Sequence, residues 1–235
     1  MQIEVLSDPN SVAERAASLI ADYAREAIAA RGSFVLAVSG GHTPWIMLRR
    51  LAAADLPWRA VQVVQVDERV APAGHTDRNL THLRESLDHA PLPSDQLYGM
   101  PVESPDLEAA ATQYAATLRK ISGASPIIDL VHLGLGPDGH TASLVPGDPV
   151  LEIDNADVAL SGPYQGRRRM TLTYPILNRA RHVLWVVTGG EKEGMVNRLL
   201  GGDRGIPAGR VSSERALLLA DSAAAGQRTG TRSAV

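Results

Sequence analysis

The chain of 235 residues contains no cysteine. This absence excludes disulfide bonds, a thiol nucleophile and a zinc site built on cysteine ligands. A chain without cysteine suits a reducing compartment, and we expect a cytoplasmic protein.

Several other features are scarce. Aromatic residues make up only 4% of the chain, so aliphatic side chains must fill most of the core. The net charge of −3 lacks the basic excess that is typical of nucleic-acid-binding domains. No apolar stretch approaches the ~20 residues that span a bilayer, and residues 1–5 lack the pattern of a signal peptide. We therefore expect neither a nucleic-acid nor a membrane partner.

The chain is rich in apolar segments that alternate with amphipathic ones. Hydrophobic residues make up 44% of it, which is ample for a core. Apolar runs predict strands at residues 3–6, 34–38, 61–66, 128–133, 158–160, 170–173, 183–187 and 216–220. Helical spacing predicts helices that include residues 12–28, 46–51, 76–87, 107–121, 175–180 and 193–200.

This alternation predicts an α/β fold with a mostly parallel sheet and helices on both faces. Ser11 and Glu14 have the spacing of a capping box at the start of the first helix. We expect a single domain over residues 1–222. The small polar residues of 223–235 predict a flexible tail.

Four predicted strands end in loops that are rich in glycine or charge. These loops are residues 39–44, 67–69, 134–140 and 188–192. Parallel strands share one carboxyl edge, and open α/β sheets bind their ligands there. We therefore expect the four loops to meet at one crevice.

The first loop, Ser39-Gly40-Gly41-His42-Thr43-Pro44, has features of a phosphate-binding turn. Its glycines admit close approach, and the free amides at a helix N-terminus attract an anion. Thr43 suits the N-cap of the following helix, and Pro44 suits its first turn. An ordinary tight turn could carry two glycines as well. Arg69 and Lys192, on neighbouring loops, favour a small phosphorylated ligand.

The loop Gly134-Leu135-Gly136-Pro137-Asp138-Gly139-His140 places a carboxylate two residues from an imidazole. A histidine beside a glycine turn is usually an ordinary hydrogen-bonded residue, but Asp138 is close enough to orient His140 or share its proton. Such a pair supplies a general base or acid near neutral pH. The loop also matches G-x-G-x-x-G, yet Pro146-Gly147 ends any helix too early for a dinucleotide site. Acid–base chemistry is therefore the favoured interpretation.

Together, these segments resemble the 6-phosphogluconolactonase family. The matching segments are residues 39–44, 67–69, 134–144, 146–147, 169–173 and 190–192, in the order in which the family carries them. The resemblance implies a three-layer, Rossmann-like α/β fold, similar to that of the glucosamine-6-phosphate deaminases. It also implies hydrolysis of 6-phospho-D-glucono-1,5-lactone, the second step of the oxidative pentose phosphate pathway, with no cofactor or metal.

The resemblance further implies roles for individual residues. His140 would activate water, with Asp138 beside it. Arg69 and Lys192 would hold the phosphate or the developing oxyanion, and Arg169 would complete the positive lining. The substrate site would also include Ser39, Gly40, Gly41, Thr43 and Asp67.

Two alternatives stay open. A sugar-phosphate isomerase or deaminase would share the fold, but deaminases usually carry a glutamate where this chain has Val145. A non-catalytic sensor would bind sugar phosphates without a usable base, and the pairing of Asp138 with His140 argues against it. The exposed faces show no clear apolar patch, and we expect a monomer.

Overall fold

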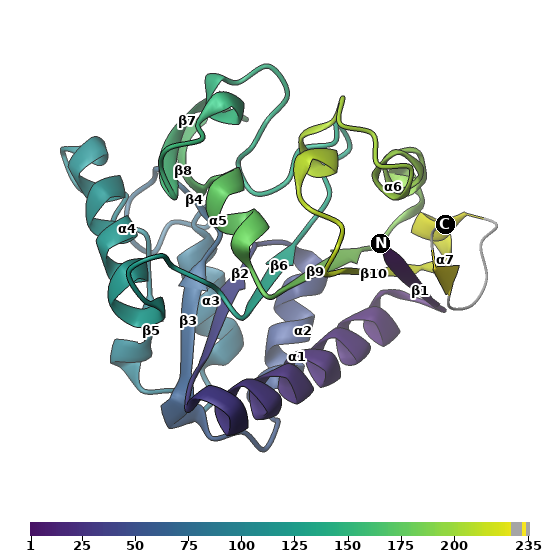
Figure 1. Ribbon diagram of the computed structural model, residues 1–235, viewed down its shortest axis with the longest axis horizontal. Helices are drawn as coiled ribbons and strands as arrows, with labels where there is room; N and C mark the ends of the chain where they lie inside the picture. The colour runs from purple at the N-terminus through teal and green to yellow at the C-terminus, as the bar shows by residue number, and fades with distance from the viewer. Residues whose placement is uncertain (227–231, 234–235) are drawn as a thin grey trace.

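The computed structural model describes residues 1–226 and 232–233, and their strands form two sheets (Figure 1). The eight strands of the large sheet follow the order β11 (Arg232–Ser233), β1 (Gln2–Leu6), β10 (Ala216–Asp221), β9 (His182–Val187), β6 (Leu130–Leu133), β2 (Phe34–Val38), β3 (Val61–Gln65) and β5 (Leu97–Tyr98). Each neighbouring pair is parallel except β1 with β11. The predicted mostly parallel sheet is confirmed.

Helices cover both faces of this sheet. On one face lie α1 (Pro9–Arg31), α2 (His42–Ala52) and α3 (Asn79–Leu87). On the other lie α4 (Leu107–Ser122), α5 (Tyr174–Arg179), α6 (Glu193–Leu200) and α7 (Ser222–Ala225). Single turns of 3₁₀ helix occur at η1 (Trp58–Ala60), η2 (Ser94–Gln96), η3 (Pro149–Glu152), η4 (Gly190–Lys192) and η5 (Pro207–Arg210). Figure 1 shows α1 and α2 side by side below the sheet.

The apolar strand runs reflect burial on both sides of the sheet. In β2, Phe34 and Leu36 pack into the core under α1 and α2, whereas Val35 and Ala37 pack into the core on the opposite face. Successive side chains of a strand point to opposite faces, so a strand covered twice needs apolar residues at every position. This requirement explains why the run is continuous and does not alternate with polar residues.

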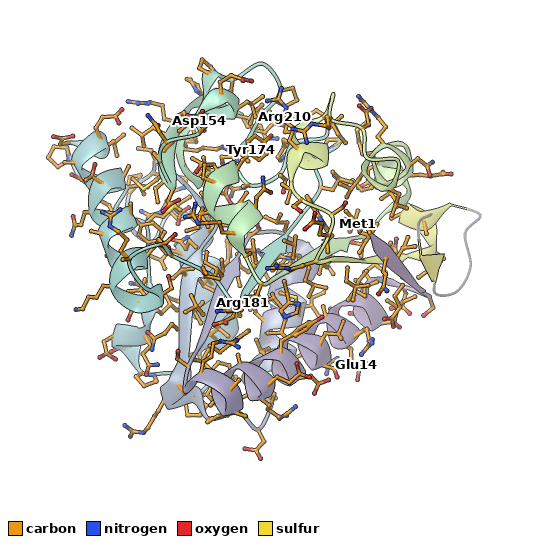
Figure 2. All side chains as sticks on the ribbon, in the orientation of Figure 1. Met1, Glu14, Asp154, Tyr174, Arg181 and Arg210 are labelled. Carbon is orange, nitrogen blue, oxygen red and sulfur yellow. The ribbon has the colours of Figure 1, made fainter. Side chains whose placement is uncertain are left out.

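The first helix begins three residues earlier than the capping-box pattern predicts. Asp8 is its N-cap, and its Oδ1 accepts hydrogen bonds from the amides of Asn10 and Ser11 at 2.9 and 3.0 Å. Pro9 occupies the first helical position, where its missing N–H costs nothing. Glu14 therefore lies within the helix on its exposed side (Figure 2). The predicted capping box is wrong.

A smaller antiparallel sheet lies over the carboxyl edge of the large one, with the order β4 (Asp67–Arg69), β8 (Arg167–Leu172) and β7 (Val158–Tyr164). The sequence predicts residues 67–69 as a loop, but they form a strand. The amide of Val66 donates to Val38 of β2, while the Val66 carbonyl accepts from Leu172, so the chain passes here from one sheet to the other. Met170 and Leu172 anchor the small sheet in the core.

The predicted tail is described in part. Ala224 and Ala225 of α7 are buried, and β11 pairs with β1. The flexible tail stays a prediction, and the remainder of 223–235 lies outside the described residues, apart from Gly226. The single-domain division over residues 1–222 stays a prediction. Among the described helices, none combines the length and the apolar character that crossing a membrane requires.

Candidate active site

The carboxyl edge of the large sheet and the small sheet enclose a cavity of about 510 Å³. Loops after β2, β6 and β9 contribute to it, together with β4 and β8. The predicted site residues that line it are Ser39, Gly40, Gly41, Thr43, Asp67, Arg69, His140, Arg169 and Lys192. Asp138 lies outside the lining and contacts His140. The structure thus brings the predicted residues together, while their roles stay predictions.

Asp138 holds His140 at one ring nitrogen. The Oδ1 atom of Asp138 lies 2.6 Å from Nδ1 of His140 and 3.1 Å from its backbone amide. An ionised carboxylate only accepts hydrogen bonds, so Nδ1 carries the ring proton in the neutral imidazole. The lone pair is then on Nε2, the nitrogen suited to act as a base.

Gly136 makes room for this ring. A Cβ atom at Gly136 would lie 2.0 Å from Nδ1 of His140 and 2.2 Å from its Cε1. The backbone also closes here, because the Gly136 amide donates to the His140 carbonyl at 2.8 Å. A side chain at this position would therefore displace the imidazole.

Tyr164, which the sequence does not single out, also contacts this pair. Its hydroxyl donates to Oδ2 of Asp138 at 3.1 Å, and its ring meets the His140 ring edge-on, with the centroids 5.1 Å apart. Partial burial raises the pKa of Asp138, but hydrogen bonds from the His140 side chain and backbone, the His140 charge and the Tyr164 hydroxyl outweigh that effect. The pKa of Asp138 therefore lies below its ordinary value.

Three cationic side chains line the cavity, and each has hydrogen-bond donors without a partner among the described residues. Arg69 donates from Nη1 to the carbonyl of Asp77 at 2.9 Å, and its buried Nε has no partner within the described structure. Arg169 is buried, and its Nη1 lies 4.0 Å from Oδ2 of Asp67. Burial lowers the pKa of Arg169, while the charge of Asp67 acts in the opposite direction.

The third cation is Lys192, in the turn η4. Its side chain is half-buried and makes no hydrogen bond or ion pair with the described part of the chain. An ammonium group at a cavity surface, with its donors free, is suited to bind an anion.

The glycine loop after β2 opens α2. Gly41, with φ 138° and ψ 162°, is the N-cap, so the predicted N-cap role of Thr43 is wrong. Thr43 lies inside the first turn, and its hydroxyl is 2.8 Å from that of Thr188 on the loop after β9. Gly40 packs against Asn79, where a Cβ atom would lie 2.1 Å from Oδ1. The two loops therefore hold one another, and the cavity wall includes the start of α2.

His132 supports this loop from within the core, and the sequence analysis does not identify it. Its Nδ1 accepts a hydrogen bond from the Ser39 amide at 3.2 Å, and its backbone carbonyl accepts one from the Ser39 hydroxyl at 3.1 Å. His132 is fully buried, and burial lowers its pKa to about 3. It is therefore neutral at ordinary pH, and it fixes the position of Ser39.

Two carboxylates anchor the β4 side of the cavity. Asp67 accepts a hydrogen bond from the Ser143 hydroxyl at 2.7 Å, which ties it to the loop after β6. Glu68 is fully buried and accepts bonds from the amides of Arg69, Asn79 and Leu80, each at 2.8 Å. Glu68 thus positions the backbone of Arg69.

The chain matches a known family over most of its length. The family model described as glucosamine-6-phosphate isomerases/6-phosphogluconolactonase matches residues 7–219. A protein from Synechocystis named 6-phosphogluconolactonase is 37% identical over 197 residues, which cover 82% of this chain and 82% of that protein.

Solved structures agree with this match. The crystal structure of a 6-phosphogluconolactonase from Thermotoga maritima is 26% identical with a TM-score of 0.84, and the match covers 93% of this chain and 98% of that one. A monomeric glucosamine-6-phosphate deaminase has a TM-score of 0.85 at 18% identity, over 97% of this chain and 100% of that one, which is a likeness of fold alone. The chain belongs to the family of glucosamine-6-phosphate isomerases and 6-phosphogluconolactonases.

Proposed function

We propose that this protein hydrolyses 6-phospho-D-glucono-1,5-lactone to 6-phospho-D-gluconate, the second step of the oxidative pentose phosphate pathway. Relatives at 33% and 37% identity that carry the name 6-phosphogluconolactonase support the substrate. The observation that carries the chemistry is the contact of 2.6 Å between Asp138 and Nδ1 of His140, at a cavity that three cations line.

His140 acts as the general base. Its Nε2 takes a proton from a water molecule while Nδ1–H stays bonded to Asp138. The water oxygen adds to the lactone carbonyl carbon, and the carbonyl oxygen becomes an oxyanion. When this intermediate collapses, the bond between that carbon and the ring oxygen breaks, and His140 returns the proton to the departing oxygen. The net reaction adds one water and needs no covalent nucleophile.

The cations divide the remaining work. Arg169 lies on the same side as the base, because Tyr164 contacts both Arg169 and His140. It stabilises the oxyanion, since a buried fixed charge is effective where negative charge develops. Lys192 shares its loop with Thr188, which contacts the glycine loop, and it binds the phosphate with the amides at the start of α2. Arg69 lies on β4 and assists in binding either the oxyanion or the phosphate.

The test follows freshly prepared lactone with and without the protein and scores the rate above spontaneous hydrolysis. We expect clear acceleration by the wild type and a loss in kcat of about 10²–10⁴ in His140→Ala, the range of general base catalysis. Circular dichroism of the variant controls for folding. A folded wild type that gives no acceleration excludes the lactonase, and a folded His140→Ala with full kcat excludes His140 as base.

The same-fold alternative is a deaminase or isomerase of sugar phosphates, because the matching family model covers glucosamine-6-phosphate isomerases as well as 6-phosphogluconolactonases. Val145 carries no carboxylate to support His140 in ring-opening and proton-transfer steps, which favours the lactonase. Turnover of glucosamine-6-phosphate by the wild type would establish the alternative. Binding of sugar phosphates without turnover of either substrate would establish a sensor.

Two further expectations accompany the proposal. Ile127 is the one large hydrophobic side chain that is exposed within the described residues, which supports a monomer. The cytoplasmic location stays a prediction from composition.

A further inference from the structure

A tight hairpin directs Tyr164 toward the His140–Asp138 pair. Tyr164 ends β7 and pairs with Arg167 of β8 across two turn residues. Both turn residues have positive φ, 52° at Gln165 and 79° at Gly166, as in the two-residue turn that matches the twist of paired strands. The backbone thereby fixes the direction in which the Tyr164 ring leaves the strand.

The hydroxyl of Tyr164 completes the hydrogen bonding of Asp138. Oδ1 of Asp138 accepts from His140, and Oδ2 accepts from the Tyr164 hydroxyl at 3.1 Å. The same hydroxyl lies 3.4 Å from Nδ1 of His140, but the proton on Nδ1 goes to Asp138. Partial burial and the charge of Asp138 raise the pKa of Tyr164, so the hydroxyl keeps its proton and donates it. Both carboxylate oxygens are thus held.

On its other side Tyr164 contacts Arg169. The guanidinium carbon lies 5.0 Å from the Tyr164 ring centroid, and Nη2 donates to the Tyr164 carbonyl at 3.3 Å. Tyr164 is not among the residues that line the cavity, whereas His140 and Arg169 both are. It contacts both groups from outside the lining, so its influence on a bound substrate passes through them.

We propose that Tyr164 is a positioning residue: its hydroxyl locks the Asp138 carboxylate, and through it the orientation of the His140 ring toward the lactone. The inference rests on the proposed function and adds to it a residue that no part of the motif pattern contains. Oδ1 of Asp138 accepts from both the backbone and the ring of His140, whereas the Tyr164 hydroxyl is the donor to Oδ2 and restricts rotation of the carboxylate about the bond to its Cβ. A misplaced base costs rate even where it is still present.

Tyr164→Phe tests this directly, because it removes the hydroxyl and keeps the ring beside Arg169 and His140. We expect kcat to fall about tenfold, the effect of losing one hydrogen bond to a charged group. KM should change less than about twofold, because Tyr164 does not line the cavity. Tyr98→Phe is the matched control, because it also removes a hydroxyl donor, bonded at 2.7 Å to Gln62, and we expect wild-type kinetics.

The pH profile separates positioning from a general loss of stability. Without the tyrosine donor, the Asp138 carboxylate attracts the imidazole proton more strongly, so the acid limb of kcat/KM should move to higher pH. In Asp138→Asn the carboxylate is gone, and adding Tyr164→Phe to that variant should cost little more. Full additivity of the two substitutions, or an unchanged acid limb with a lowered kcat, contradicts a role through Asp138.

An NMR measurement keeps the inference distinct from the lactonase assignment. The Nδ1 proton of His140 should resonate far downfield in the wild type and shift in Tyr164→Phe but not in Tyr98→Phe. If the wild type hydrolyses the lactone while Tyr164→Phe retains its kcat and this resonance, the inference is wrong and the proposed function stands. If the wild type is inert but the resonance shifts, the proposed function fails and the hydrogen-bonded chain from Tyr164 to His140 stands.

Discussion

The cavity has two walls that are built in different ways. The loop wall, residues 39–43 and 188–192, rests on parallel strands of the large sheet and offers glycine backbone and one free lysine. The dyad wall, named for the Asp138–His140 pair, consists of residues 136–140 and Arg169, which Tyr164 contacts from outside the cavity lining. It combines a loop of the large sheet with a hairpin of the small one. The loop wall supplies donors that are free for a ligand, whereas many polar atoms of the dyad wall already bond to one another.

This difference matches the two tasks of a hydrolase. An anion such as phosphate can be bound by several donors without strict geometry, because charge attraction acts over distance. Proton transfer needs the base within hydrogen-bond reach of its water, so the groups around the base must hold it still. We therefore expect changes in the dyad wall to act mainly on kcat and changes in the loop wall to act mainly on KM.

The largest effect is expected in the dyad wall from Gly136→Ala. The added Cβ atom would lie 2.0 Å from Nδ1 of His140, so the ring must turn away and break its bond to Asp138. We expect kcat to fall about 100-fold, in line with the cost of a displaced catalytic group. Steady-state kinetics with the lactone measure this effect.

Gly194→Ala is the control for Gly136→Ala. A Cβ atom at Gly194, in α6, meets no atom within 4 Å, and we expect wild-type activity. If Gly136→Ala retains a kcat within about twofold of the wild type, the orientation of His140 is not what limits the reaction.

The next effect concerns the residue beneath the loop wall, His132. Burial lowers its pKa to about 3, well below its ordinary value of 6.5, so below pH 6.5 the unfolded chain binds a proton that the folded chain does not. Stability therefore falls as the pH decreases toward 3. Between pH 7 and pH 5 the loss is about 2 kcal/mol in the free energy of unfolding.

His132→Asn should remove this pH dependence. The asparagine Oδ1 can accept the bond from the Ser39 amide, and the side chain does not titrate. Urea unfolding at pH 7 and pH 5 compares it with the wild type and with His89→Asn, a substitution at an exposed histidine that should leave the dependence unchanged. Equal acid sensitivity in all three proteins would mean that His132 gains a proton in the folded state.

The parallel arrangement of the loop wall could be predicted from the sequence because its causes are local. Apolar runs such as residues 34–38 predict strands that are buried on both faces, and parallel strands bring their carboxyl ends to one edge. Ser39 and Gly40 follow such a strand directly and Lys192 lies in the loop after another, so their meeting at the cavity follows from topology. The exact start of α2 depends on Gly41, whereas the sequence predicts the N-cap at Thr43.

The dyad wall could be predicted only in part, because its contacts join distant segments. Asp138 and His140 are neighbours in sequence, but Tyr164 lies 24 residues from His140. Gly166 marks a turn between the predicted strands 158–160 and 170–173, but these predicted strands are too short to show that the turn has only two residues. The pairing of β4 with β8 brings Arg69 opposite Arg169. The sequence of β4 consists of three charged residues, and nothing in it indicates that this segment forms a strand or which strand it pairs with.

The smallest effect is expected in the loop wall from Lys192→Ala. The side chain makes no hydrogen bond with the described residues, so its removal should leave the fold and the dyad wall intact. We expect KM for the phosphorylated lactone to rise about tenfold, which corresponds to one charge-assisted bond of about 1.5 kcal/mol, with kcat nearly unchanged. Lys120→Ala, at the chain's other and exposed lysine, should behave as the wild type. With an unphosphorylated gluconolactone, wild type and Lys192→Ala should be equal. If Lys192→Ala lowers kcat for both lactones instead, Lys192 acts on the oxyanion, and the division of labour between the two walls is wrong.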